Sequence, residues 1–170
     1  RRTFNGGLNW ATINVGTSSW LSSIFFINQN VGYIAGGTSG SGLILKTTNA
    51  GTTWSVTSLS SSYQLNDVYF ANADTGYAVG GGNLGNPGII FRSIDGGNNW
   101  SNITCPSPSS LWGVHFMSTD TGFVTGINGI IYKTTDAGNS WTNAYSNPFG
   151  LYGITFYDKT NGFAVGGNGG

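Results

Sequence analysis

The chain is 170 residues long, enough for one domain with a real core, and its six basic and six acidic residues give a formal net charge of zero. Charged residues make up 7% of the sequence, against roughly 25% in an ordinary soluble domain. This balance gives no electrostatic reason to expect nucleic acid or an anionic membrane surface as a partner. The polar surface must come from Asn, Ser, Thr and Gly, and no Glu is present. Such a composition predicts a secreted protein, extracellular or on the cell surface.

The sequence offers little chemistry for catalysis or metal binding. Cys105 is the only cysteine, so no intrachain disulfide can form, and the only histidine is His115. We interpret Cys105 as a small, half-buried apolar residue. No apolar run approaches the length of a membrane span, so the chain is not expected to cross a membrane. No metal ion and no cofactor is predicted.

One motif, Ser/Thr-x-Asp/Asn-x-Gly-x-x-Trp, occurs four times, first near the N-terminus and then at intervals along the chain. Its tryptophans are spaced by 44, 46 and 41 residues. Recurrence at a fixed period of this size is the signature of a repeat architecture. The defining residues of the four copies are Asn5, Gly7 and Trp10; Asn49, Gly51 and Trp54; Asp95, Gly97 and Trp100; and Asp136, Gly138 and Trp141.

The motif is expected to lock a turn. Its Asp or Asn side chain can accept backbone N–H bonds across the turn, its Gly supplies a positive φ or a close backbone approach, and its Trp holds the turn on its own sheet. Four copies at one structural position argue for a structural role, because a catalytic site is needed only once. A basic residue precedes each Asp or Asn by three positions, and we interpret these four as a solvated strand face or a local pair to the turn: Arg2, Lys46, Arg92 and Lys133.

Between the motifs, short β-branched and aromatic runs alternate with Gly, Asn and Ser, which is typical of strands and turns. First strands are predicted at 24–26, 68–70, 114–116 and 154–156, and second strands at 33–35, 77–79, 123–125 and 163–165. Third strands are predicted at 43–46, 89–92 and 130–133, and each motif Trp opens a fourth. A single all-β domain follows, with units at about 20–60, 63–106, 110–147, and 150–170 together with 1–15.

Four antiparallel strands in each unit of 40–45 residues is the size of a β-propeller blade. Two columns of aromatic residues recur at equivalent positions of the first and second strands. We expect them to pack between adjacent sheets. The first-strand column is Phe26, Phe70, Phe116 and Phe156, and the second-strand column is Tyr33, Tyr77, Phe123 and Phe163.

The last unit stops after its second strand, and residues 1–15 supply a third strand, a motif and a fourth strand. The simplest interpretation is a propeller of four blades per chain, with the last blade completed by the N-terminal strands, which would remove exposed sheet edges. Two alternatives remain open. Two chains could form an eight-bladed ring, each completing the other's broken blade, or the chain could be part of a larger propeller.

The four motif copies resemble the Asp-box, or bacterial neuraminidase repeat. The whole unit is similar to the repeats of the photosystem II assembly and stability factor family, and to those of secreted bacterial surface proteins. The resemblance covers essentially the whole chain. It implies a β-propeller with the boxes on outer turns between strands three and four. The photosystem factors are expected to have seven blades and an arginine-rich patch, and neither is visible here, so their role is not carried over.

Enzymes that carry the box need groups that this chain lacks. Sialidases use an arginine trio and a tyrosine–glutamate pair, but the chain has no Glu. Box-containing glucanases need two opposed carboxylates. Only Asp67 lies outside the boxes and the repeated turns, so a glycoside hydrolase is disfavoured and no catalytic residue is predicted.

Function should lie where the repeats differ. Variation is concentrated at the starts of the first strands, on the propeller face that usually binds ligands, and the loop 81–88 is longer than its counterparts. Aromatic side chains beside Asn, Ser and Asp suit a protein or a glycan, although they could also plug the channel. We therefore expect a non-enzymatic extracellular binding module, or alternatively a purely structural repeat domain of a larger surface protein. The candidate ligand-binding residues are Trp20, Tyr63, Asp67, Trp112, His115, Phe149 and Tyr152.

Overall fold

A computed structural model of the chain describes residues 1–82 and 86–167. Three complete four-stranded antiparallel sheets and one two-stranded sheet follow one another along the chain, with the strand order equal to the sequence order. The predicted β-propeller blades are confirmed. The central part of the long loop 81–88, residues 83–85, lies outside the described residues.

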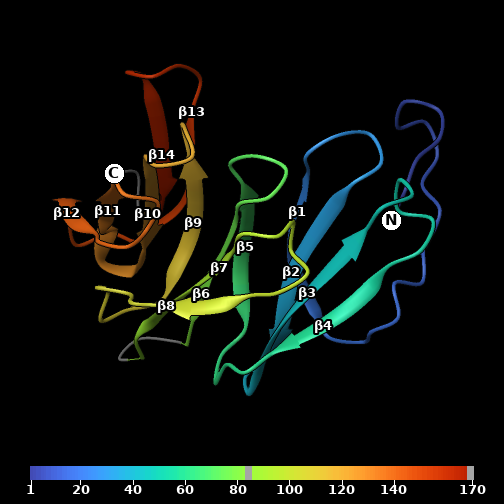
Figure 1. Ribbon diagram of the computed structural model, residues 1–170, viewed down its shortest axis with the longest axis horizontal. Coiled ribbons are helices and arrows are strands. Elements are labelled where there is room, and N and C mark those ends of the chain that lie inside the picture. Colours follow the sequence, from blue (N-terminus) through green and yellow to red (C-terminus); the bar gives the residue numbers. More distant parts are fainter. Residues whose placement is uncertain (83–85, 168–170) are drawn as a thin grey trace.

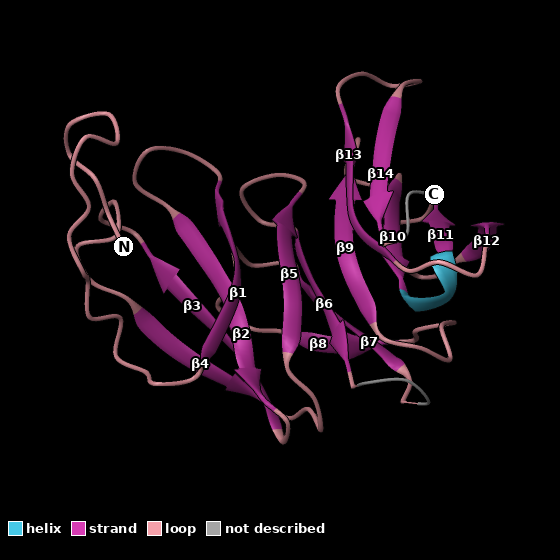
Figure 2. Cartoon of the chain, turned by 180° about the vertical axis from the view of Figure 1, so that it is seen from behind, coloured by secondary structure: helices cyan, strands magenta, loops and turns pink. Residues whose placement is uncertain are grey.

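The blades succeed one another in an open arc, with the N-terminus at one end and the last sheet at the other (Figures 1 and 2). The first blade contains β1 (Trp20–Phe26), β2 (Gly32–Thr38), β3 (Ser41–Thr47) and β4 (Ser55–Leu59). The second contains β5 (Leu65–Phe70), β6 (Gly76–Gly81), β7 (Gly88–Ser93) and β8 (Ser101–Ile103). The third contains β9 (Leu111–Phe116), β10 (Gly122–Gly126), β11 (Ile131–Thr134) and β12 (Thr142–Tyr145), with a 3₁₀ turn η1 (Ile127–Gly129). The fourth sheet contains β13 (Leu151–Phe156) and β14 (Gly162–Gly166).

Stacked aromatic rings join each blade to the next, as the two predicted columns require. The Tyr33 ring lies 3.7 Å from that of Phe70 at an interplanar angle of 15°. Tyr77 stacks on Phe116 in the same way, at 3.8 Å and 10°. These rings bury large apolar surfaces and hold neighbouring sheets at a fixed spacing. Phe123 and Phe156 continue the series between the third blade and the last sheet, at 4.6 Å and 21°.

Each box locks the turn after the third strand of its blade, as expected. In the second blade, Ser93 accepts a hydrogen bond from Gly97 N at 2.8 Å, and the Asp95 carboxylate accepts one from Asn99 N at 2.9 Å. Gly97 has φ 78°, and a Cβ there would also collide with the ring of Tyr33. Gly97 therefore serves both the positive φ of the turn and the close approach of the preceding blade. The structural interpretation of the boxes fits this geometry.

The basic residues of the third strands do not pair with their own turns. Lys46 Nζ of the first blade donates to Asn98 Oδ1 in the box of the second blade, at 2.8 Å. Arg92 Nη1 of the second blade donates to Ala137 O at 2.8 Å and to Asn139 Oδ1 at 3.1 Å, both in the box of the third. The expectation of a local pair or a solvated face is wrong for these two residues. The reason is that the stacked rings bring each box alongside the third strand of the preceding blade.

Tyrosine hydroxyls complete this contact between blades. Tyr33 OH donates to Gly96 O at 2.8 Å, and Tyr77 OH donates to Ala137 O at 2.9 Å. In each case a tyrosine of the second strand and a Lys or Arg of the third strand are both bonded to the box of the next blade. We call this combination the box clasp. It is present between the first and second blades and between the second and third.

The N-terminal segment, residues 1–15, does not complete the last blade. It lies against the first blade, where Val15 packs on Ile34, Leu43 and Leu45, while Arg2 and Ala11 form an isolated antiparallel bridge. The last sheet consists of β13 and β14 within the described residues. The stacked rings and the box clasps fix the angle between neighbouring blades. At this angle the two ends of the arc lie apart. The predicted closure by the chain's own N-terminal strands is therefore not observed.

The described part of the chain contains no helix whose length and hydrophobicity would let it cross a membrane.

Candidate ligand-binding face

The first strand of each sheet (β1, β5, β9 or β13) is the innermost strand of the arc. Its pairing with the second strand is irregular near its start, at the same position in all four sheets. The pairing register shifts between Leu21 and Ser23 in β1, between Leu65 and Asp67 in β5, between residues 111 and 113 in β9, and between Leu151 and Gly153 in β13. One residue of each first strand is thus left unpaired, as in a β-bulge. Bulges re-aim a side chain and are common beside binding sites. The four bulged residues are Ser22, Asn66, Trp112 and Tyr152.

A glycine opposite each bulge makes this geometry possible. A Cβ atom at Gly36 would overlap the carbonyl oxygen of Trp20, and a Cβ atom at Gly126 would overlap that of Ser110. Gly80 and Gly166 are under the same constraint. The second strand must therefore carry Gly at this point, because only Gly permits such a close approach of two backbones. The repeated glycine fixes the backbone, while the bulged residue is free to vary from blade to blade.

Two of the predicted ligand residues meet at this edge of the arc. Trp112 of β9 and Tyr152 of β13 form an edge-to-face pair with ring centroids 5.5 Å apart at 75°. The Trp112 indole N–H is buried and has no hydrogen-bond acceptor among the described residues, while Tyr152 is 53% exposed. The pair therefore presents the exposed ring of Tyr152, held edge-to-face by Trp112.

The other predicted aromatic residues lie along the same edge but apart from this pair. Trp20, at the start of β1, is 80% exposed. Tyr63 precedes β5 and donates through its hydroxyl to Asn86 Oδ1 at 2.8 Å. Phe149 lies two residues before β13 and is partly exposed, and its backbone N–H is bonded to Asn147 Oδ1. These rings therefore lie in a row along one edge of the arc and do not line one common pocket.

Asp67 belongs to the framework of the arc. Its carboxylate accepts hydrogen bonds from Ser23 Oγ of the first blade at 2.5 Å, from Val68 N of its own strand at 2.9 Å, and from Val114 N of the third blade at 3.0 Å. Burial raises the pKa of this carboxyl, and these three donors act in the opposite direction. With its oxygens already bonded within the chain, Asp67 is placed to tie three innermost strands together.

His115 is part of an aromatic row that crosses the innermost strands. Its ring lies 4.8 Å from that of Tyr69 and 5.7 Å from that of Phe156, and the row continues from Tyr69 to Phe25 at 4.9 Å. Burial lowers the pKa of His115, so the imidazole is neutral at pH 7. A small polar cavity of about 270 Å³ opens beside it, lined also by Asp158 and Lys159.

Sequence reasoning missed Asn66, the bulged residue of the second blade. Its side chain is buried and donates to Leu111 O at 2.7 Å and to Ser110 Oγ at 3.3 Å, at the start of the third blade. The signal that could have found it is the repeated glycine opposite the bulge. Asn66 stabilises the strand start that presents Trp112.

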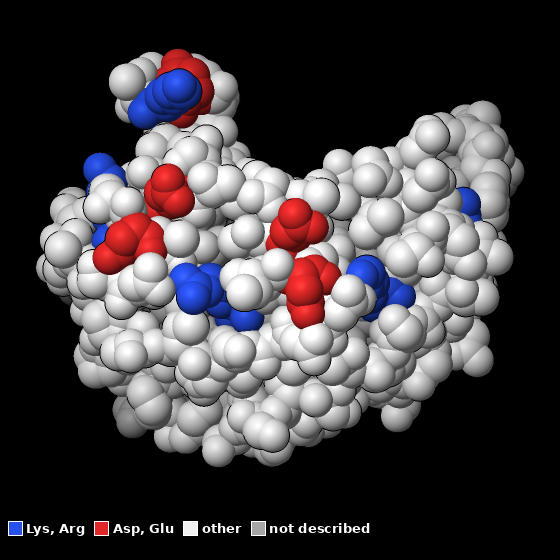
Figure 3. All heavy atoms as spheres, in the orientation of Figure 1, with Lys and Arg blue, Asp and Glu red and all other residues white. Residues whose placement is uncertain are grey.

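This edge of the arc presents no charged side chain. In Figure 1, β5 and β9 run upward, so their starts lie at the lower edge, and Figure 3 shows that lower edge without acidic or basic residues. Apart from Asp67, every charged residue belongs to the N-terminal segment, to a box, to a third strand or to a turn between first and second strands. These residues are Arg1, Arg2, Lys46, Asp74, Arg92, Asp95, Asp120, Lys133, Asp136, Asp158 and Lys159.

Cys105 and the acidic residues have surroundings that limit their chemistry in the described part of the chain. Cys105 is half-buried, and burial raises the pKa of its thiol to about 11, so the thiolate nucleophile is scarcely populated at pH 7. No group of three or more His, Cys or Asp side chains is placed to hold a metal ion in residues 1–82 and 86–167. The two larger cavities, of about 360 and 380 Å³, are apolar and lie at the two ends of the arc.

Comparison with known proteins gives both a family and a fold. The family model described as "Photosynthesis system II assembly factor YCF48" matches residues 5–150. The solved structure "YCF48 bound to D1 peptide" is 23% identical with a TM-score of 0.68 and aligns with 82% of this chain. YCF48 from Cyanidioschyzon merolae is 28% identical with a TM-score of 0.63 over 76% of this chain.

The alignments cover 45% and 38% of those two YCF48 chains, so this chain spans less than half of their length. A GH74 xyloglucanase from Xanthomonas campestris shares the fold at 18% identity and a TM-score of 0.57, over 74% of this chain and 23% of the enzyme. Among curated proteins, none matches the sequence.

Proposed function

The chain belongs to the YCF48 family of photosynthesis system II assembly factors, and from this premise we propose that it is a non-enzymatic module that binds a protein partner during photosystem II assembly. The partner segment that we propose is an extended peptide, held at the edge of the arc where the innermost strands begin. The observation that carries the proposal is the row of bulged positions, which keeps one backbone geometry in all four blades while its side chains differ.

The family corrects the location predicted from composition. The extracellular or cell-surface location is wrong, because the family is that of an assembly factor for photosystem II, which acts within the cyanobacterial cell or the chloroplast. The composition misled for a physical reason. Asn, Ser, Thr and Gly are numerous because the boxes and hairpin turns require them in every repeat, so their abundance reflects the architecture rather than the compartment.

The chemistry of the edge suits a peptide with apolar or aromatic side chains. Tyr152 and Trp20 present exposed ring surface, and Trp112 supports the Tyr152 ring edge-to-face. Because no charged side chain lies there, affinity would come from ring burial and hydrogen bonds rather than from ion pairs. The arginine-rich patch expected for photosystem factors has no counterpart at this edge. A peptide, as named in the related "YCF48 bound to D1 peptide" structure, is the ligand class to test first.

An enzymatic role has no carboxylate pair to support it. Asp95 and Asp136 are bonded within their boxes, Asp158 within its turn, and Asp67 between blades. The other two acidic residues, Asp74 and Asp120, are exposed in separate turns between first and second strands. A glycoside hydrolase needs an acid and a second carboxylate facing each other across a substrate. The likeness to a xyloglucanase therefore concerns the fold alone.

The test is a titration of fluorescently labelled D1 peptide with the chain, in which the fluorescence anisotropy of the peptide measures binding. We expect Trp112→Ala to weaken binding by about tenfold or more, which corresponds to about 1.4 kcal/mol for a hot-spot aromatic residue. Tyr157→Ala is the matched control. Tyr157 is 69% exposed but lies in the turn between β13 and β14, at the other end of the strand, so its loss should leave binding unchanged.

The same titration distinguishes the alternative functions. Equal losses in the two variants would overturn the proposed site. Binding to members of a glycan array in place of the peptide would favour a lectin. No binding to either class, with an intact circular dichroism spectrum, would favour a purely structural repeat domain.

A further inference from the structure

A small polar cavity opens where the first strands end, at the opposite end of β9 from Trp112. Its volume is about 270 Å³, and its walls are the ends of β5 and β9 on one side and the end of β13 with the turn after it on the other. Rings join these walls: Phe156 lies 5.7 Å from His115 and 4.6 Å from Phe123. The cavity is therefore part of the junction between the third blade and the last sheet.

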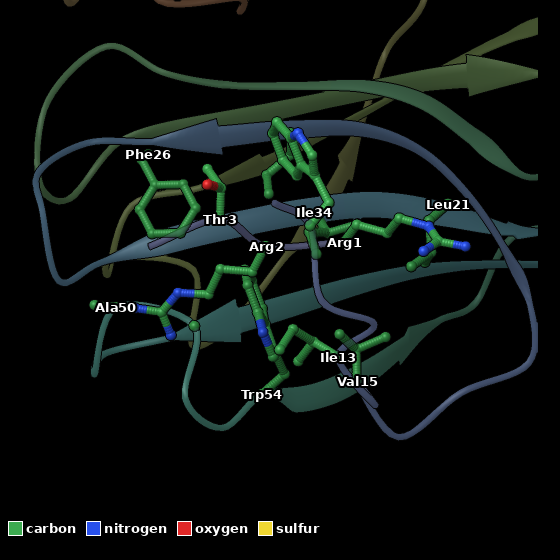
Figure 4. A pocket seen from close by; sticks show the side chains of 13 residues that line it. Arg1, Arg2, Thr3, Ile13, Val15, Leu21, Phe26, Ile34, Ala50 and Trp54 are labelled. Atoms are coloured by element: carbon green, nitrogen blue, oxygen red, sulfur yellow. The ribbon is translucent and has the colours of Figure 1, made fainter. Parts of the chain in front are cut away.

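The two larger cavities have a different chemistry. In the cavity of about 360 Å³ beside the first blade, Ile13, Ile34 and Trp54 supply apolar walls. The Arg2 side chain extends there toward Ala50 (Figure 4). The cavity of about 380 Å³ is also mainly apolar. The small cavity instead brings hydroxyl, imidazole, carboxylate and ammonium groups together, so it suits a polar ligand.

Two of these groups stand at positions where the repeats differ. His115 is the only histidine of the chain, and Lys159 is the only basic residue in the four turns between first and second strands. The corresponding residues of the other repeats are Phe25, Tyr69 and Thr155 for His115, and Gln29, Ala73 and Thr119 for Lys159. The framework that all blades share does not depend on either residue, yet both line one cavity. This combination is what a site specific to one junction requires.

The cavity offers hydrogen-bond donors that the chain itself does not use. The Tyr69 hydroxyl and the His115 imidazole are half-buried, and neither bonds another described residue. Burial raises the pKa of Tyr69 and lowers that of His115, so both groups are neutral at pH 7 and each has one proton to donate. Lys159, whose ammonium group has no partner among the described residues, adds a positive charge. Two neutral donors and a cation suit an oxyanion.

Asp158 limits the charge of that oxyanion. Hydrogen bonds from the Asn161 side chain and from the Thr160 and Asn161 amides hold the pKa of Asp158 at about 2, so it is ionised at pH 7. These bonds engage the carboxylate within its own turn, while its charge balances that of Lys159. A phosphate dianion would bring two negative charges to a lining that is neutral in sum, whereas a carboxylate brings one. The lining therefore favours a monocarboxylate.

Aromatic rings form the rest of the lining. Phe116, Phe156 and Tyr157 lie beside the polar groups, and aromatic faces favour a ring that packs against them. The volume of about 270 Å³ is just below the roughly 300–1,000 Å³ of pockets that hold drug-sized ligands. The ligand should therefore be small and carry an aromatic ring.

We propose that this cavity binds a small aromatic monocarboxylate. Lys159, His115 and Tyr69 bind the carboxylate, and the ring of the ligand packs against Phe116 and Phe156. The site is separate from the peptide-binding edge, which lies where the first strands begin.

Benzoate is the probe for the test, and two unique residues report its binding. His115 is the only histidine, and Met117, which also lines the cavity, is the only methionine. In NMR titrations, the His115 ring C–H and Met117 methyl signals should shift saturably with benzoate and stay in place with benzamide, its uncharged counterpart. No saturable shift, an equal response to benzamide, or a stronger response to inorganic phosphate would overturn the assignment.

Substitution of the cation gives a second measurement. Lys159→Gln should raise the dissociation constant of benzoate at least about tenfold, because a charge-assisted hydrogen bond is lost. Lys133→Gln is the matched control, since Lys133 lies over the Phe123 ring and does not line the cavity. His115→Phe keeps a ring but removes the N–H, and should weaken binding severalfold with Met117 as the reporter. Equal dissociation constants in the two lysine variants would contradict the proposed site.

Discussion

Two junctions can be compared: the one between the second and third blades, and the one between the third blade and the last sheet. They have ring stacking in common and differ in their hydrogen bonds. Both contain a stacked ring pair, Tyr77 on Phe116 and Phe123 on Phe156. Only the first also has a box clasp, in which Tyr77 and Arg92 bond the next box. No box follows the last sheet among the described residues, and Lys133 lies over the Phe123 ring at 5.7 Å.

The difference shows what the box contributes beyond its own turn. Its carbonyl and amide oxygens are the acceptors that the preceding blade uses, so a box stabilises two blades at once. The stacked rings hold blades together by apolar burial, while the clasp fixes their orientation through directional bonds.

The largest effect on the complete junctions should come from Asp67, which bonds three innermost strands. Asp67→Ala leaves the Val114 and Val68 N–H groups and Ser23 without their acceptor, and we expect a loss of about 3 kcal/mol in the free energy of unfolding. Urea denaturation followed by tryptophan fluorescence measures it. Asp120→Ala, in an exposed turn, is the control and should change stability by less than about 0.5 kcal/mol. Similar losses of unfolding free energy in the two variants would show that the hydrogen bonds of Asp67 do not stabilise the contacts between blades.

A smaller effect should distinguish the two junctions directly. Tyr77→Phe removes the hydroxyl bond to Ala137 O but keeps the stacked ring, and should cost about 1 kcal/mol. Phe123→Tyr adds a hydroxyl at the junction where the described residues include no following box, and should be close to neutral. The two unfolding curves, measured side by side, test the clasp. A neutral Tyr77→Phe would show that ring stacking alone holds the complete junctions.

The smallest effect concerns acid pH and the boxes themselves. Hydrogen bonds from Asn99 and from Ser140 hold the pKa of Asp95 and Asp136 at about 2, below the value in an unfolded chain. A lowered folded-state pKa contributes stability that is present above the unfolded pKa, near 4, and is lost as the pH falls through about 2. Asp67, whose pKa is raised, contributes with the opposite sign.

Amide proton NMR shifts measure this titration box by box. The amides of Asn99 and Ser140, which donate to Asp95 and Asp136, should titrate with midpoints near pH 2. The Thr53 amide donates to Asn49, which does not ionise, and should stay constant. A titrating Thr53 signal would mean that the whole arc loosens in acid, and that the boxes are not the groups responsible.

Much of the packing could be predicted from the sequence because it depends on residues that recur. The Tyr33–Phe70 contact and its counterparts followed from two aligned columns, and the turn chemistry followed from the box pattern. The target of Lys46 and Arg92 could not be predicted, since a side chain on a strand gives no sign of which blade it reaches. Trp112 and Tyr152 were found as variable positions, but the bulge that presents them became visible only in the strand register.

Asp67 illustrates the limit for single residues. It lies near the start of a first strand, where the repeats differ, and that variation suggested a ligand contact. The structure places it between Ser23 and Val114, on strands of the first and third blades. A residue that occurs once can serve the framework when it lies at the centre of the arc, where several strands converge.

The sequence by itself determined the blade, because each blade depends on local chemistry: alternating apolar residues, a turn that needs Gly and Asp or Asn, and a Trp that covers it. Only the tertiary structure decided how the blades are joined and where the arc ends. The angle between blades results from stacked rings and box clasps between residues of different blades, as between Tyr33 and Phe70. No single repeat contains both partners of such a contact, so the pattern of one blade cannot show how it meets the next or that the N-terminal segment lies against the first blade.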